Sequence, residues 1–203
     1  DGPVIQRASE AALAAGATLE RCLEAAAEIG RRVEMPVVLF SYYNPLLQFG
    51  LERLADRLAA SRVDGLLVTD VVPEEGGPLV AAMGPRGVDT IFLAAPTSSD
   101  ERLARVASVA TGFVYAVSRT GVTGAREALS DSARPLVERV RRHTTLPIAV
   151  GFGISTPEQV RDVWRYADGA VVGSRLVAEI AASPGEPLRA VDFVKRVLSA
   201  ESL

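Results

Sequence analysis

Hydrophobic residues along the chain follow two patterns that alternate from one end to the other. Short apolar runs rich in β-branched residues predict buried strands at residues 36–41, 65–69, 90–94, 112–117, 147–150 and 168–172. Between these runs the apolar residues recur at helical spacing, which predicts helices at residues 8–15, 19–33, 46–60, 100–109 and 133–143, others starting near residues 74 and 157, and helical segments to the end. Strands that alternate with helices form a parallel sheet with right-handed crossovers, so the pattern predicts an α/β fold.

Local signals mark several helix ends. Gly16 separates the first two predicted helices, and Thr18 is a candidate side-chain cap for the second. Ser155 and Thr156 precede Pro157, a residue that is favoured in the first turn of a helix. We therefore expect side-chain caps at both of these helix starts.

The number of repeating units leaves two architectures open. About six strand–helix units are present, whereas a (β/α)8 barrel has eight strands and typically about 250 residues. A doubly wound open sheet usually has a glycine-rich turn after its first strand, and residues 41–45 (Ser-Tyr-Tyr-Asn-Pro) contain no glycine. Glycines instead gather after the last three strands, as at the phosphate site of a barrel. The chain fits either a doubly wound sheet or a (β/α)8 barrel without its first two strands.

Composition narrows the class of protein. The chain has 203 residues, 48% of them hydrophobic and 23% charged, which predicts one folded globular domain over residues 1–203. Its net charge of −3 provides no basic excess for a nucleic acid partner. No apolar run approaches the roughly 18 residues that a membrane span needs. The single cysteine, Cys22, rules out an internal disulfide and fits a reducing compartment, so we expect a cytoplasmic protein.

The scarcity of some residue types argues against two kinds of chemistry. Lys195 is the single lysine among 22 basic residues and falls on a predicted amphipathic helix at residues 191–198, which disfavours a lysine-based aldolase. His143 is the single histidine and lies at a helix end, where a solvated or capping role is expected. One histidine and one cysteine are too few for a His/Cys zinc site. Carboxylates and tyrosines remain as acid–base candidates.

Two glycine turns are candidates for phosphate binding. Residues 151–155 (Gly-Phe-Gly-Ile-Ser) follow one predicted strand, and Gly173-Ser174 follow the next. Both turns precede helices, whose first N–H groups lack helical partners and carry partial positive charge. Glycine also lets the backbone approach an anion closely. Ordinary turn chemistry explains either turn alone, but the pair at the last two strands favours a phosphate site.

Three further features could carry chemistry at the same end of the strands. Strand alternation places Tyr115 and Phe113 on one side of their strand, where Tyr115 is either a core residue or reaches into a barrel mouth. The loop from Ser118 to about Ser130 is rich in glycine and threonine, so it is either a lid or an ordinary surface loop. Asp1 precedes Gly-Pro and on this evidence alone is a turn or capping residue.

Taken together, these segments resemble the tryptophan synthase alpha subunit family. The resemblance rests on residues 1–6 (Asp-Gly-Pro-Val-Ile-Gln), 41–45, 115–124 (Tyr-Ala-Val-Ser-Arg-Thr-Gly-Val-Thr-Gly), 151–155 and 173–174. It implies a (β/α)8 barrel that cleaves indole-3-glycerol phosphate to indole and glyceraldehyde 3-phosphate in tryptophan biosynthesis. It also implies an allosteric α2β2 heterotetramer with a beta subunit, which carries pyridoxal phosphate, while this subunit is expected to hold no cofactor and no metal.

The resemblance also assigns roles to individual residues. Asp1 corresponds to the catalytic aspartate that accepts the indole N–H, Tyr115 to the active-site tyrosine, and Thr123 to the lid threonine that closes onto the aspartate. The other positions correspond to a phosphate site (Gly124, Phe152, Gly153, Gly173 and Ser174), to apolar positions in the indole pocket (Ile5 and Leu93), and to the face that meets the beta subunit (Asn44).

The sequence departs from the family pattern in two places. The family's second carboxylate, a glutamate that shuttles protons, and its first two strands fall before the first residue given, so we expect an excerpt of a longer protein. Residues 70–73 (Asp-Val-Val-Pro) also differ from the usual family sequence in a loop of the beta-subunit face.

Two alternatives remain beside the alpha subunit. One is another phosphate-binding barrel, an isomerase or epimerase, although an epimerase would need metal-binding histidines and an isomerase two similar halves, and no internal repeat is seen. The other is a non-catalytic partner of a beta subunit. That alternative gives no reason to retain Asp1, Tyr115 and Thr123.

Overall fold

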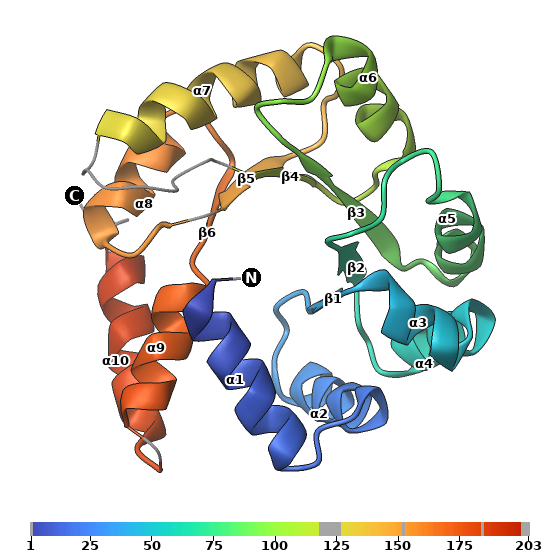
Figure 1. Cartoon of the computed structure of the whole chain (residues 1–203), viewed down its shortest axis with the longest axis vertical. Helices are drawn as coiled ribbons and strands as arrows, with labels where there is room; N and C mark the ends of the chain where they lie inside the picture. The colour runs from blue at the N-terminus through green and yellow to red at the C-terminus, as the bar shows by residue number, and fades with distance from the viewer. Residues whose placement is uncertain (1, 118–126, 152, 184, 200–203) are drawn as a thin grey trace.

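Six parallel strands, hydrogen-bonded in the order β1-β2-β3-β4-β5-β6, form the centre of the molecule (Figure 1). The computed structural model describes residues 2–117, 127–151, 153–183 and 185–199. The strands are β1 (Val38–Ser41), β2 (Gly65–Val68), β3 (Asp89–Ala94), β4 (Val114–Val117), β5 (Ile148–Gly151) and β6 (Gly169–Val171). Each strand pairs with its neighbours in sequence, without the reversal of order that defines a doubly wound sheet. The sheet is therefore a half-barrel, and the doubly wound alternative is wrong.

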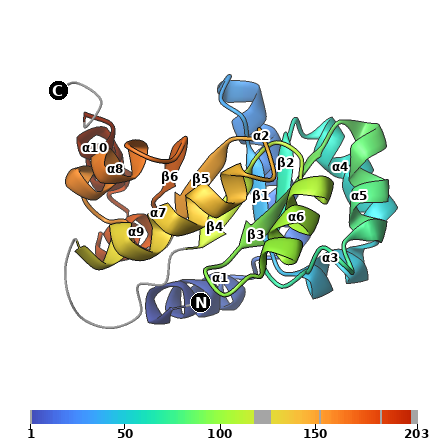
Figure 2. The same ribbon diagram turned by 90° about the horizontal axis from the view of Figure 1, so that it is seen from above.

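Helices line the outer side of this arc (Figure 1). They are α1 (Pro3–Ala14), α2 (Leu19–Arg32), α3 (Tyr43–Phe49), α4 (Leu51–Ala60), α5 (Gly77–Met83) with the 3-10 turn η1 (Gly84–Arg86), α6 (Asp100–Val109), α7 (Glu127–Arg141), α8 (Pro157–Trp164), α9 (Ser174–Ala182) and α10 (Pro187–Leu198). Helix α1 packs against α9, so the first helix of the chain lies beside one of the last (Figures 1 and 2).

The strands have two different faces because successive side chains point to opposite sides. One face packs under the helices and belongs to the large hydrophobic core, with Phe92, Val114 and Ile148 at 0–1% exposure. The other face lines the inside of the arc and forms a separate small cluster around Leu67, Ile91 and Tyr115. The predicted alternation of Tyr115 and Phe113 against Val114 is confirmed, because Tyr115 and Phe113 lie on the inner face.

Several predicted elements need correction. Residues 46–60 form two helices, since Gly50 separates α3 from α4 with φ +90° and ψ 120°, a backbone conformation that ends a helix. The loop after β4 was expected to continue to about residue 130, but α7 already begins at Glu127. The first helix begins at Pro3 rather than at residue 8, and the fifth at Gly77 rather than near residue 74.

Other predicted boundaries are confirmed with their physical causes. Helix α6 covers residues 100–109 as predicted, and its first turn donates the Arg102 N–H to Ser99 Oγ at 3.3 Å. The expected cap at Thr18 accepts the Arg21 N–H at 3.2 Å. Thr156 forms the other expected cap, as part of a capping box.

Candidate functional site

Tyr115 stands at the centre of the inner face of the sheet. It lies in β4 beside Leu93 of β3, its partner in the strand register, and belongs to the apolar cluster with Leu67. The ring of Phe40, on β1, meets the Tyr115 ring edge-on, with centroids 6.4 Å apart and planes at 69°. Three strands thus converge on one aromatic side chain, which is 9% exposed.

The hydroxyl end of Tyr115 rests directly on the backbone of β5. A Cβ atom placed on Gly151 would lie 1.9 Å from the Tyr115 hydroxyl oxygen and 2.3 Å from Cζ. These distances are far below van der Waals contact, so Tyr115 can occupy this position only because residue 151 lacks a side chain. The sequence places Gly151 in a phosphate turn, but in the structure its missing side chain leaves the space that the Tyr115 hydroxyl occupies.

The surroundings of Tyr115 also fix its protonation state. Burial raises the pKa of the Tyr115 hydroxyl above its ordinary value of 10.0 because the phenolate would lose its hydration. At neutral pH the side chain is therefore a phenol. It can donate a hydrogen bond and offer an apolar ring face, but it is not poised to act as a base.

The turn after β5 is held by its own side chains. Gly153 is exposed and has φ +77°, a left-handed conformation that favours glycine. Ile154 is buried next to it at 3% exposure. The N–H groups of Ser155 and Thr156 donate to Gln159 Oε1 at 2.8 and 3.2 Å. The two amides that lead into α8 are consequently satisfied from within the protein.

The turn after β6 is different. Gly173 is the N-terminal flanking residue of α9 and makes no side-chain capping hydrogen bond. Both Gly173 and Ser174 are exposed. The start of α9 is therefore exposed and lacks a side-chain cap, and it carries the partial positive charge of a helix start that an anion site uses. Because β5 and β6 are neighbouring strands, this helix start and Gly153 follow adjacent strand ends.

The remaining predicted site residues fall into three groups. Leu93 and Tyr115 are together on the inner face. Ile5 is half-buried on α1, which packs against α9, and no contact joins Ile5 to the Tyr115 cluster within the part of the chain that the structure describes. Asp1, Thr123, Gly124 and Phe152 lie outside the described residues.

Asn44 is exposed on the short helix α3, at the carboxyl end of β1. The first amide of this helix, the Tyr43 N–H, donates to Asp70 Oδ1 at 2.7 Å. Asp70 belongs to the loop after β2, so the two loops are joined at this point. The segment that departs from the family pattern therefore holds the helix that carries Asn44.

Sequence reasoning missed two inner-face residues, Phe40 and Leu67. It also missed that Gly151 leaves space for the Tyr115 hydroxyl. Phe40 is 56% exposed, although it contacts Tyr115. The available signal was the alternation within β1 and β2, which indicates the face but not which residues of different strands meet. That information lies in the strand register, in which Phe40 pairs with Leu67.

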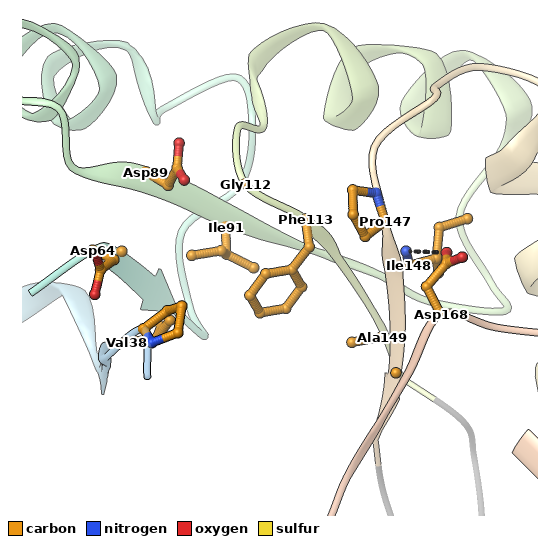
Figure 3. A pocket seen from close by; sticks show the side chains of 13 residues that line it. Val38, Asp64, Asp89, Ile91, Gly112, Phe113, Pro147, Ile148, Ala149 and Asp168 are labelled. Atoms are coloured by element: carbon orange, nitrogen blue, oxygen red, sulfur yellow. Dashed lines mark hydrogen bonds between the residues drawn. The ribbon is translucent and has the colours of Figure 1, made fainter. Parts of the chain in front are cut away.

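A cavity of about 310 Å³ opens at the opposite, amino end of the strands (Figure 3). Apolar side chains such as Ile91 and Phe113 line its centre, and three carboxylates stand around it. Two of these are tied to neighbouring strands, since Asp64 accepts the Val37 N–H at 2.7 Å and Asp168 accepts the Ile148 N–H at 2.8 Å. Carboxylates that accept backbone hydrogen bonds from neighbouring strands have a structural role. Barrels place their catalytic residues at the carboxyl end of the strands. We therefore do not place the active site here.

The described residues contain neither a candidate metal site nor a candidate membrane span. No group of three or more His, Cys, Asp and Glu side chains in the described ranges could hold a metal ion. Likewise, none of the helices in the described part of the chain is both long and apolar enough to cross a membrane.

Comparison with known proteins gives one consistent result. The family model for the tryptophan synthase alpha chain matches residues 1–200. The tryptophan synthase alpha chain of Roseiflexus castenholzii is 52% identical over 198 residues, which cover 96% of this chain and 76% of the relative. That of Solibacter usitatus is 50% identical over 200 residues, which cover 97% of this chain and 75% of the relative.

Solved structures agree with the sequence relatives. Tryptophan synthase of Mycobacterium tuberculosis superimposes with a TM-score of 0.91 at 37% identity, and the match covers 100% of this chain and 76% of that chain. A tryptophan synthase α2β2 complex from the hyperthermophile Pyrococcus furiosus gives a TM-score of 0.91 at 36% identity, covering 100% of this chain and 82% of that one.

Proposed function

Because the chain belongs to the tryptophan synthase alpha chain family, we propose that the carboxyl end of its half-barrel cleaves indole-3-glycerol phosphate to indole and glyceraldehyde 3-phosphate. This is the alpha reaction of tryptophan biosynthesis, carried out by a lyase. One observation carries the assignment to this end of the sheet. An apolar face with a buried tyrosine adjoins an uncapped helix start, and the substrate has a flat apolar ring at one end and a phosphate at the other.

The phosphate is bound at the ends of β5 and β6. Backbone amides of Gly153, Gly173 and Ser174 hold its oxygens, with Gly124 and Phe152 completing the site. The contrast between the two helices supports this arrangement. Helix α8 is capped by its own residues, whereas α9 is not, so α9 supplies the helix-dipole contribution to phosphate binding.

The indole ring occupies the inner face beside Tyr115. Leu93 and Ile5 contribute apolar walls, and Phe40 and Leu67 extend the same surface. Asp1 accepts the hydrogen bond from the indole N–H. Tyr115, kept as a phenol by burial, packs against the substrate and donates a hydrogen bond without taking a proton.

The chemistry requires two proton movements around one broken bond. A proton is added to indole C3, and a proton leaves the hydroxyl of the adjacent side-chain carbon. The C3–carbon bond then breaks, its electrons return to the indole ring and a carbonyl forms on the departing triose phosphate. Protonation at C3 places positive charge on the ring, which the Asp1 carboxylate stabilises through N1–H. Binding of the phosphate orients the bond for cleavage, and closure of the lid at Thr123 excludes water.

The half-barrel is best explained as part of one eight-stranded barrel domain, with residues 1–203 belonging to that single domain. Two further strands would lie between β6 and β1 and cover the open part of the inner face. Val38 and Phe40 of β1 point toward that open part, at 38% and 56% exposure. Barrel interiors are filled by layers of side chains, so exposed apolar residues at these positions fit an incomplete lining.

The proposed assembly is an α2β2 complex in the cytoplasm. A beta subunit that carries pyridoxal phosphate would meet the face around Asn44, and this subunit would work without a cofactor or metal. The P. furiosus neighbour, described as an α2β2 complex, supports this partner. The tie between Asp70 and Tyr43 would hold the contact helix in place.

An indole-release assay on the full-length protein tests the proposed function. Indole-3-glycerol phosphate should yield indole slowly with the protein alone and much faster with a beta subunit, because the two sites are coupled. The Asp1→Asn variant should lower indole formation by about 10²-fold or more, since it removes charge stabilisation from the transition state, while phosphate binding persists. A folded protein that releases no indole even with the partner would leave the binding-only alternative.

A further inference from the structure

We propose that Gln159 is a positioning residue for phosphate binding, and that its side-chain oxygen sets the shape of the turn that presents the Gly153 amide. The proposal rests on the proposed function, because it concerns the phosphate half of the same site. It adds a residue that touches neither the substrate nor the reacting atoms.

Three donors converge on one atom of Gln159. Its Oε1 accepts the Ser155 N–H at 2.8 Å, the Ser155 hydroxyl at 3.1 Å and the Thr156 N–H at 3.2 Å. In return, the Gln159 N–H donates to Thr156 Oγ1 at 3.3 Å. All three residues are half-buried, so these bonds have limited competition from water. One side chain therefore fixes two consecutive peptide units of the turn.

The fixed peptide units stand next to the proposed phosphate ligand. Ile154 is anchored in the core at 3% exposure, and Gln159 fixes the residues that follow it. Gly153 precedes them with φ +77°, and glycine is the residue that moves most freely when its support is lost. The direction of the Gly153 amide therefore depends on a turn that is held on its carboxyl side by Gln159.

The same hydrogen bonds also make the starts of α8 and α9 different. Gln159 accepts from the two amides that lead into α8, while Gly173 leaves α9 without a side-chain cap. Without the Gln159 acceptor, the amides of Ser155 and Thr156 would become competing donors for the phosphate or would turn to solvent. Either change would move the phosphate away from the position that directs the scissile bond.

A purely structural role would make Gln159 an ordinary helix cap. Its loss would then lower stability and affect all ligands alike. A positioning role predicts a selective effect on ligands that carry a phosphate. The test therefore compares two probes that differ by that group alone, 3-(indol-3-yl)propyl phosphate and 3-(indol-3-yl)propanol, by calorimetric titration of the full-length protein.

Gln159→Met keeps the length of the side chain and removes the acceptor. We expect it to weaken binding of the phosphate probe by about tenfold, and to leave binding of the alcohol within about twofold of wild type. Thr18→Ala is the matched control, because it removes the side-chain cap of α2 without touching the turn.

The outcomes separate the inference from the proposed function. Wild-type protein that binds both probes equally would contradict the phosphate site itself. A wild-type preference for the phosphate probe that persists in Gln159→Met would overturn the role of Gln159 alone. Equal weakening of both probes would also overturn it.

Discussion

Among single residues, Tyr115 and Gly151 constrain each other, because the tyrosine occupies the space that a side chain at position 151 would need. The tyrosine hydroxyl lies where any side chain at position 151 would begin. The residue type at each position therefore restricts the residue type at the other, although the two are 36 positions apart in the sequence, because β4 and β5 are hydrogen-bonded neighbours in the sheet.

Gly151→Ala should lower both stability and activity. Its methyl group would lie 1.9 Å from the Tyr115 hydroxyl oxygen, and such overpacking typically costs about 1–3 kcal/mol. Displacing the ring also distorts the proposed indole pocket, so kcat/KM for indole release should fall further than stability alone explains. Urea unfolding and steady-state kinetics measure the two effects.

Gly169→Ala on β6 is the matched control for this substitution. Its Cβ would meet Ala149 at an ordinary 3.4 Å, so we expect little change. In a Tyr115→Leu background, Gly151→Ala should cost less than in wild type, since the colliding atoms are gone. Strictly additive costs would show that the two residues do not share this space.

Asp168 gives a residue-level prediction about pH. Burial alone would raise the pKa of its carboxyl group, but hydrogen bonds from the Ile148 N–H and the Arg141 guanidinium hold that pKa below the ordinary value of 3.8. A carboxylate with a lowered folded pKa stabilises the protein above its unfolded pKa, and the stabilisation is lost as pH falls through the folded pKa.

Asp168→Asn should therefore lower the free energy of unfolding at neutral pH by about 1 kcal/mol, a modest value because the pair is half-exposed and screened. Between about pH 5 and pH 3 the variant should lose less stability than wild type. Urea titrations over this range measure both, with Asp192→Asn on the exposed side of α10 as the control. Parallel pH curves for wild type and variant would contradict the linkage.

How much of the site could be predicted differs from residue to residue. Alternation along β4 suffices to place Tyr115 on the inner face, and the glycine turns indicate an anion site. Phe40 and Gly151 could not be assigned to the tyrosine, because their contacts depend on the register between strands rather than on any pattern within one strand. The difference between the two glycine turns could not be predicted either, because it rests on the capping hydrogen bonds that α8 makes and α9 lacks.

Among the elements, prediction succeeded where local chemistry marks both ends. Helix α6 begins after the Ser99 cap and stops as the backbone becomes extended at Ala110, and its bounds were predicted correctly. Helix α7 was predicted to start too late, at residue 133, because the glycine- and threonine-rich loop was extended to about Ser130, whereas the helix begins at Glu127. At Gly50, one continuous apolar pattern concealed a change of helix axis.

Gly50→Ala tests the joint between α3 and α4. The residue combines φ +90° with ψ 120°, which an alanine adopts with strain of about 1–3 kcal/mol. There is open space around the missing Cβ, so the cost would come from the backbone and not from a collision. We expect a lower melting temperature and, because α3 carries Asn44, weaker activation by the beta subunit.

Gly84→Ala provides the comparison for this joint. It lies in the right-handed region, with φ −54°, and nothing beyond its chain neighbours comes within 4 Å of the added Cβ. Because Pro85 follows and disfavours this region for alanine, we expect a small loss of stability, below that of Gly50→Ala. Thermal unfolding of both variants and indole release with increasing beta subunit are the measurements. A Gly50→Ala protein as stable as Gly84→Ala would remove the strain argument.

For the whole molecule, the two faces of the sheet differ in how fully they are covered. Helices bury the outer face along the middle strands and cover it in part at β1 and β6, whereas the inner face is closed near Tyr115 and open near β1. The alternation of strands and helices was enough to predict a parallel sheet. It could not give the strand order or the curvature, because a doubly wound sheet and a barrel share this alternation and differ in long-range strand order.

Phe40 provides the test of barrel closure. In an eight-stranded barrel of the full-length protein its ring would be enclosed, and Phe40→Ala should then lower the free energy of unfolding by about 3–5 kcal/mol, as for a buried phenylalanine. In the six-stranded sheet the ring is 56% exposed, and its removal would cost much less. Met35→Ala, at a side chain 71% exposed just before β1, is the control and should change stability by about 0.5 kcal/mol or less. Because both residues belong to one stretch of chain, equal costs in urea unfolding would mean that nothing further packs on the inner face, and the eight-stranded closure would have to be abandoned.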